Sequence, residues 1–268
     1  QAIGYAYESI KYGLQEVMIA GGADEMHFTT AVTFDLMFAT SANYNDQPDR
    51  SPRPFDTRRD GLVVGEGAAT LVLESLERAQ ARGANILGEL RGFGTNCDGI
   101  HITAPSETGM CGAMALSLHD AGLSAADIDY VNAHGTATDI GDVAETGATR
   151  TIFARAVPIS SPKSFTGHTM GACGAIEAAF CLAMLRDLLL RRQQRFHANH
   201  LSGLQPIARH NAVAHLECFG KQKIGIEVKQ RRLGIDAMHH IHERDVLRSE
   251  TTRQHDPVPI RVQCVLQH

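Results

Sequence analysis

The amino-acid sequence predicts an α/β protein whose sheet is mostly parallel. From residue 86 onward, short apolar runs that fit buried strands alternate with longer segments of helical spacing. A glycine or a polar capping residue separates many of these segments, as expected at helix ends. Helices that alternate with strands in this way cover the faces of a parallel sheet.

The elements are expected in the following order. In the first part of the chain, the spacing predicts a helix over 1–13, a strand over 17–20, a helix over 29–39, a strand over 68–73 and a helix over 74–82. From residue 86 it predicts strands over 86–92, 128–132 and 157–160, and helices over 109–121, 141–153 and 171–186. Ser124 to Asp127 has the pattern of a capping box on a short turn.

The composition is that of an ordinary globular protein. The 268 residues are 43% hydrophobic and 21% charged, and no apolar run reaches membrane-spanning length. The net charge of −5 gives no whole-chain argument for nucleic-acid binding. Six cysteines without a CxxC pair predict reduced thiols and a cytoplasmic location. Because Gln1 starts in the middle of a helical pattern, we expect the chain to be a fragment.

The chain changes character near residue 188. Nine of the 14 histidines lie beyond residue 190, and no strand pattern there is convincing. We therefore expect residues 191–268 to be an atypical tail that is disordered or read in an altered frame. His239, His240 and His242 could be interpreted as a metal cluster, but no carboxylate or cysteine frame supports a closed site.

Two histidines follow predicted strands and stand next to glycine. His134 lies in the segment Asn132–Thr138, and His168 lies in the segment Lys163–Glu177. In a parallel sheet, functional groups gather beyond the carboxyl ends of the strands, so this placement favours a site. A neutral imidazole can donate an N–H to a carbonyl oxygen that becomes negative in a transition state. Two such donors would form an oxyanion site, and loss of one would cost about 3 kcal/mol.

Four further polar residues are candidates. Lys163 could tune the neighbouring histidine or simply be solvated, and spacing leaves both interpretations open. Glu177 lies on an otherwise apolar helix face, where an unpaired carboxylate would be costly, so we expect it to accept hydrogen bonds or pair with a cation. Thr136 and Thr138 offer hydroxyls to an amide-bearing ligand, or they bond within the turn.

These segments resemble two motifs of the β-ketoacyl-acyl-carrier-protein synthases. Residues 132–142 resemble the H-G-T motif of that family, and residues 163–177 resemble its K-S-x-x-G-H-x-x-G-A-x-G-x-x-E block. Residues 12–22, 53–67 and 72–83 also match, in the family's order and approximate spacing. The resemblance covers roughly residues 1–187.

The resemblance implies a thiolase-like fold with αβαβα layers, incomplete here at both ends. Residues 1–85 would be the remnant of the N-terminal half, and residues 86–190 the C-terminal half. The family reaction is a decarboxylative condensation of a malonyl thioester with an acyl thioester in fatty acid biosynthesis. Both substrates are carried on the phosphopantetheine of acyl carrier protein. No metal or redox cofactor is needed, and the full-length protein would be a homodimer.

The resemblance also assigns roles to the candidate residues. His134 and His168 would hold the malonyl thioester carbonyl and stabilise the enolate that forms on decarboxylation. Lys163 would support the electrostatics around His168, and Glu177 would anchor the surrounding polar network. Thr136 and Thr138 would bind the phosphopantetheine arm.

Two departures from the family pattern limit this expectation. The family's nucleophilic cysteine would fall a few residues before Gln1, and none of the six cysteines stands in its motif. The family's glycine-rich C-terminal loop has no counterpart after residue 187. We therefore expect that the chain alone does not complete condensation. A polyketide-type ketosynthase, or a non-condensing partner like the chain-length factors, remains an alternative; a thiolase is disfavoured because its cysteine motif is missing.

Overall fold

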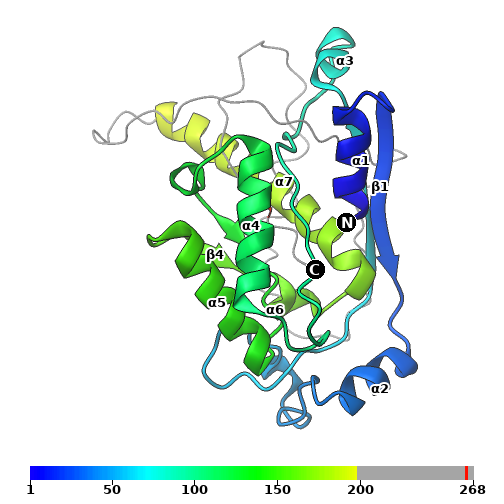
Figure 1. Ribbon diagram of the computed structural model, residues 1–268, viewed down its shortest axis with the longest axis vertical. Coiled ribbons are helices and arrows are strands. Elements are labelled where there is room, and N and C mark those ends of the chain that lie inside the picture. The colour runs from blue at the N-terminus through cyan, green and yellow to red at the C-terminus, as the bar shows by residue number, and fades with distance from the viewer. Residues whose placement is uncertain (198–262, 265–268) are drawn as a thin grey trace.

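The computed structural model describes residues 1–197 and 263–264 (Figure 1). The helices are α1 (Ala2–Lys11), α2 (Phe28–Leu36), α3 (Leu76–Ala81), α4 (Glu107–Ala121), α5 (Asp139–Phe153), α6 (Lys163–Thr166) and α7 (Cys173–His197). The strands are β1 (Val17–Asp24), β2 (Gly67–Glu74), β3 (Val131–Asn132), β4 (Ile159–Ser160) and β5 (Gln263–Cys264). Three short 3-10 turns are η1 (Pro48–Arg50), η2 (Ala125–Asp127) and η3 (Met170–Ala172). Most of the predicted tail, including residues 239–242, lies outside the described residues.

The first sheet pairs β1 with β2 in antiparallel order, from Val17 opposite Glu74 to Asp24 opposite Gly67. The sequence predicted both strands, but not their antiparallel pairing. The strand predicted over 17–20 is four residues too short, because glycine is typical of strand ends and residues 21 and 22 are glycines. These glycines continue the ladder, and a side chain at Gly21 would meet the backbone of the paired strand.

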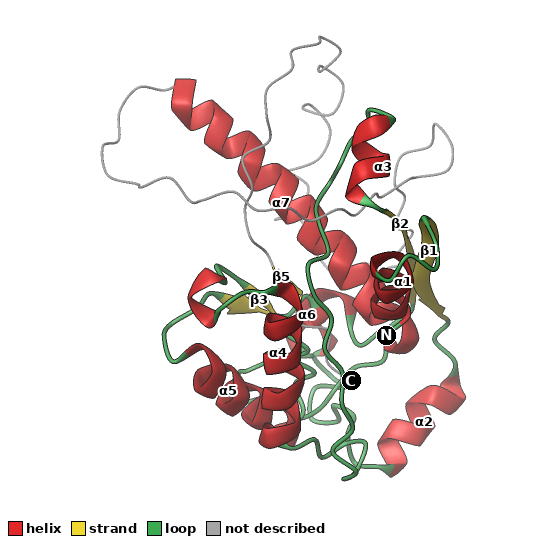
Figure 2. Cartoon of the chain, turned by 45° about the horizontal axis from the view of Figure 1, so that its top comes forward, coloured by secondary structure: helices red, strands yellow, loops and turns green. Residues whose placement is uncertain are grey.

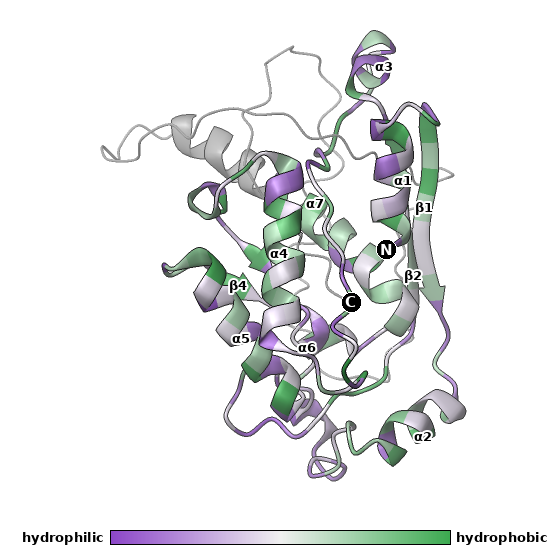
Figure 3. Cartoon of the chain, viewed as in Figure 1, coloured by the Kyte–Doolittle hydropathy of each residue, from purple (hydrophilic) through white to green (hydrophobic). Residues whose placement is uncertain are grey.

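One face of this sheet is covered by two helices that lie far apart in the sequence. Its buried cluster joins α1, both strands and α7, and Figure 2 shows α7 as the long helix that begins beside α1. The buried residues are Ile3, Ala6, Ala20, Leu71, Leu73 and Ala175. On the opposite face, Ile19 of β1 is 64% exposed. Figure 3 shows hydrophobic colouring in the first part of β1.

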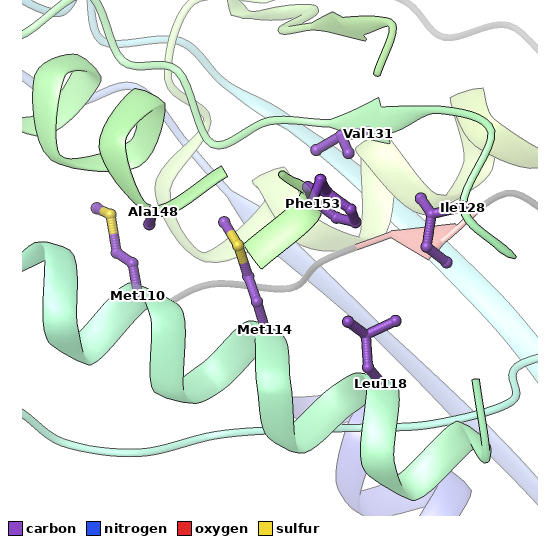
Figure 4. Packing of buried hydrophobic residues seen from close by; sticks show 7 residues of the cluster. All are labelled: Met110, Met114, Leu118, Ile128, Val131, Ala148 and Phe153. Carbon is purple, nitrogen blue, oxygen red and sulfur yellow. The ribbon is translucent and has the colours of Figure 1, made fainter. Parts of the chain in front are cut away.

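The second sheet has the order β4-β3-β5, and both pairings are parallel. This confirms the prediction of a parallel sheet in the second part of the chain. Its core lies between α4, α5 and β3, where Met110, Met114, Leu118, Ile128, Val131, Ala148 and Phe153 pack together (Figure 4). The cluster fixes β3 against the helices. The loop that leaves β3 therefore starts from a rigid point.

Three expectations about strands were wrong. Residues 86–92 form no named strand in the described part of the chain. Backbone groups in and beside this segment bond to side chains instead: Tyr7 donates to the Arg91 carbonyl at 2.8 Å, and Phe93 N–H donates to Asp120. The strands predicted over 128–132 and 157–160 shorten to two residues each. Beyond residue 190, where no strand was expected, β5 pairs with β3.

Helix boundaries follow the capping residues. The third helix starts two residues later than predicted because Glu74 completes β2 and the Ser75 hydroxyl accepts from Arg78 N–H as the cap. The Ser106 side chain caps α4 in the same way, which moves its start back to Glu107. The predicted capping box at η2 is confirmed. The final helix continues to His197 rather than ending at residue 186, and thus crosses the expected boundary at residue 190. The domain boundary near residue 85 stays a prediction.

Candidate active site

His134 lies in the loop that follows β3, and a buried carboxylate holds its backbone. The N–H groups of His134 and Gly135 each donate to one oxygen of Glu145 at 2.7 Å. Ser161 Oγ donates to the Gly135 carbonyl at 2.9 Å from the other side. Gly135 has φ +38°, and a Cβ there would lie 2.6 Å from the Cβ of Ser161. Only glycine fits this turn, because it tolerates both the dihedral and the close approach.

Two acidic side chains of α5, Asp142 and Glu145, hold the loop that contains His134. Glu145 is 3% exposed, and burial raises its pKa to about 7, although its two backbone N–H donors act in the opposite direction. Asp142 accepts from the N–H groups of Phe55 at 2.6 Å and Ala137 at 3.1 Å. Burial also raises the pKa of Asp142, since it outweighs these hydrogen bonds. Both carboxylates therefore accept hydrogen bonds from backbone N–H groups rather than from solvent.

His168 occupies a turn between α6 and η3 that is tied to residues 63–65. Its backbone N–H donates to the Val63 carbonyl at 2.7 Å, and its carbonyl accepts from Gly65 N–H at 2.9 Å. Its ring atom Nδ1 accepts from Met170 N–H at 3.2 Å. In a neutral imidazole only one ring nitrogen carries the proton, so this hydrogen bond places the proton on Nε2. The Nε2 edge of the ring is therefore an N–H donor.

The tertiary structure brings the two histidines together. The centroids of the His134 and His168 rings lie 5.1 Å apart, with the ring planes at 84°. The two residues are 34 positions apart in the sequence, and each follows a different strand of the same parallel sheet. The fold thus places the two imidazoles side by side. Two imidazoles at this separation can direct hydrogen-bond donors at one oxygen atom.

Lys163 and Glu177 form a buried ion pair between α6 and α7. Lys163 is 1% exposed, and its Nζ contacts Glu177 Oε1 at 2.5 Å. Burial raises the pKa of Glu177, while Lys163 and a side-chain hydrogen bond from Asn132 oppose that rise. Of the interpretations left open above, the structure excludes a solvated lysine. Glu177 has the cation that its burial requires.

Thr136 and Thr138 lie together at the start of α5. Their hydroxyl oxygens are 2.9 Å apart and share a hydrogen bond. Thr136 is 8% exposed, and Thr138 is the N-cap residue of the helix. The turn hydrogen bonding that the sequence offered as one interpretation is therefore present. Binding of a pantetheine arm by these residues stays a prediction.

Burial works against an activated thiolate at two cysteines of the described region, Cys111 and Cys173. Cys173 and Cys181 are buried. Burial raises the pKa of the Cys173 thiol despite nearby Lys163, and burial likewise raises that of Cys111. A thiol with a raised pKa remains protonated and is a weak nucleophile.

Comparison with known proteins assigns the chain to a family. The model described as "Beta-ketoacyl synthase, N-terminal domain" matches residues 1–79, and the model described as "Beta-ketoacyl synthase, C-terminal domain" matches residues 87–197. The chain belongs to the β-ketoacyl synthase family. Its fold is thiolase-like, as the sequence predicted.

Relatives of this β-ketoacyl synthase chain are longer than the chain itself. The 3-oxoacyl-[acyl-carrier-protein] synthase 1 of Haemophilus influenzae is 46% identical over 186 residues, which are 68% of this chain and 45% of that protein. A β-ketoacyl synthase structure from Burkholderia phymatum is 57% identical with a TM-score of 0.68, over 70% of this chain and 46% of that one. The chain spans about half the length of the curated relatives it matches.

A second similar structure is that of a type II polyketide acyl carrier protein in complex with its ketosynthase bound to the hexaketide. It is 33% identical, with a TM-score of 0.66, over 68% of this chain and 46% of that one.

Sequence reasoning missed several residues that build the site. Glu145, Asp142 and Ser161 carry the His134 loop, and Asn132 joins the Lys163–Glu177 pair. A signal for the two acids was available: both lie in the first turns of a helix that directly follows a glycine turn. Carboxylates at a helix N-terminus commonly accept backbone N–H groups. Ser161 offered no such local signal.

Proposed function

We propose that this chain carries the malonyl-activating part of a 3-oxoacyl-acyl-carrier-protein synthase, an acyltransferase of fatty acid biosynthesis. The paired imidazoles of His134 and His168, 5.1 Å apart, carry the proposal. A malonyl thioester would place its carbonyl oxygen between the two rings. When the bond to the carboxylate breaks, carbon dioxide leaves and the electron pair moves toward that oxygen. Two N–H donors stabilise the resulting enolate. Its carbon attacks the carbonyl carbon of the acyl thioester, the C–S bond of that thioester breaks, and its sulfur leaves as a thiolate.

The other residues take supporting roles in this proposal. Lys163 places a positive charge near His168, and Glu177 anchors that charge. Thr136 and Thr138 hydrogen-bond the phosphopantetheine arm. The acyl-accepting thiolate comes from outside the six cysteines of this chain, so the chain is not expected to complete condensation alone.

The partners and location also belong to the proposal. Acyl carrier protein delivers both substrates, in agreement with the names of the curated relatives. No metal or redox cofactor takes part, the full-length protein is a homodimer, and it acts in the cytoplasm. None of the described helices is both long and apolar enough to cross a bilayer.

Fatty acid synthesis is favoured over a polyketide pathway because relatives named for fatty-acid-type synthases are more similar in sequence. The Haemophilus protein is 46% identical, whereas the polyketide ketosynthase structure is 33% identical. A polyketide-type ketosynthase, or a partner subunit without a nucleophile, is the alternative. The residue that aligns with the family's nucleophile distinguishes a condensing enzyme from such a partner.

The test is decarboxylation of malonyl-acyl carrier protein by a version extended to the full length of the family. His134→Ala and His168→Ala should each lower carbon dioxide release by about 10²- to 10³-fold, the effect of losing one oxyanion donor. His119→Ala, at the exposed end of α4, is the matched control and should retain the unmodified rate. A histidine variant that decarboxylates at the unmodified rate would remove that residue from the mechanism.

A further inference from the structure

The turn that carries His168 contains a backbone conformation that needs outside support. Met170 has φ +41°, in the left-handed region that residues with a side chain rarely adopt. Such a conformation persists only where the surrounding structure fixes it, and it is typical of functional sites. The next residue, Gly171, contacts a distant part of the chain, so the support for the turn can be identified.

Asp24 supplies that support from the end of β1. Its Oδ2 accepts a hydrogen bond from Gly171 N–H at 2.9 Å, across 147 positions of sequence. Gly22 of the same strand also packs closely against the turn. A Cβ at Gly22 would lie 2.2 Å from the Gly171 carbonyl oxygen. A carboxylate acceptor makes a stronger hydrogen bond than a neutral one. The strand end and the turn are therefore held in one geometry.

This geometry determines which nitrogen of His168 carries the proton. Met170 N–H lies between the strained backbone and the ring, and it donates to Nδ1 at 3.2 Å. If the turn relaxes, this donor moves away and the proton can occupy Nδ1. Nε2 would then be an acceptor and could no longer donate to a carbonyl oxygen.

We propose that Asp24 is a positioning residue for His168: its hydrogen bond to Gly171 holds the 168–171 turn and thereby keeps the ring in the Nε2–H form. The importance of that form for catalysis rests on the proposed function above. The effect of Asp24 on the ring does not. Asp24 touches no reacting atom and acts only through the turn.

The test reads the ring nitrogens directly by ¹⁵N NMR of the 268-residue chain labelled at histidine, at a pH where imidazoles are neutral. The His168 signals are assigned by their loss in His168→Gln. Two acceptor-free variants are compared, Asp24→Ala and the strand-favouring Asp24→Val. Each should raise the ratio of the Nδ1–H form to the Nε2–H form about fivefold, the factor for loss of one ordinary hydrogen bond.

Two further variants control the interpretation. Glu25→Ala removes the adjacent exposed carboxylate and should leave the His168 spectrum unchanged. Asp24→Asn keeps an acceptor oxygen and should restore most of the Nε2–H form. The proposal is overturned if a folded Asp24→Ala or Asp24→Val variant keeps the wild-type His168 spectrum. It is also overturned if the ratio of the Nδ1–H to the Nε2–H form in Asp24→Asn equals that in Asp24→Ala. The NMR readout needs no turnover. Absence of decarboxylase activity in the extended version would therefore count against the proposed function and not against the role of Asp24.

Discussion

The buried pair of Lys163 and Glu177 should be strongly coupled in stability. Lys163→Met leaves a buried carboxylate without its cation, and Glu177→Gln leaves a buried ammonium group without its anion. Breaking such a pair by removing one partner costs about 3–5 kcal/mol. The double variant leaves no charge behind and only a buried amide, so it should cost only about 1–3 kcal/mol, well below the sum of the single costs.

The cost of Lys163→Met should also depend on pH. Burial already raises the pKa of Glu177, and Lys163 opposes that rise. Without the lysine, the folded-state pKa of Glu177 moves further above the ordinary value of a glutamate carboxyl. A carboxyl with a raised folded-state pKa contributes stability that is lost as pH rises through that pKa. The variant should therefore lose more stability relative to the wild type at pH 8 than at pH 5, where Glu177 takes up a proton.

The assay is urea unfolding followed by far-ultraviolet circular dichroism, with both single variants and the double variant at pH 5 and pH 8. A double variant whose cost equals the sum of the single costs within about 0.5 kcal/mol would refute the coupling. A Lys163→Met cost that is equal at the two pH values would refute the assignment of the buried charge to Glu177.

Two further predictions concern the His134 loop. Burial raises the pKa of Glu145 from 4.5 to about 7, so its carboxyl should withdraw about 3 kcal/mol of stability as pH rises across that interval. Glu145→Gln should flatten this slope in urea titrations between pH 4.5 and 7.5, and an unchanged slope would contradict the burial argument. Gly135→Ala places a Cβ 2.6 Å from the Cβ of Ser161 at φ +38°, and it should destabilise the chain by about 1–3 kcal/mol. Gly83 also has a positive φ, but an added Cβ there would meet no atom within 4 Å. Gly83→Ala should therefore lose less stability in thermal unfolding than Gly135→Ala, and its loss measures the backbone strain without the clash.

Local patterns predicted much of the fold because helices and their ends depend on nearby residues. The spacing of apolar residues located α1, α2, α4, α5 and α7, and Gly122 marked the end of α4. The same locality failed for residues 86–92. That segment is apolar enough for a strand, but backbone groups in and beside it bond to Tyr7 and Asp120, which no local pattern connects to them.

The sequence by itself determined which residue types stand at the candidate site: two histidines beside glycines, a lysine, a glutamate and two threonines, each just past a strand or at the start of a helix. Only the tertiary structure decided how they are used. It paired Lys163 with Glu177, placed Glu145 under the His134 backbone, and brought Asp24 to the His168 turn. The reason is physical: which donor meets which acceptor depends on where the packed sheets and helices bring the chain together. The separation of two residues along the sequence does not show whether their side chains lie within hydrogen-bond distance in the fold.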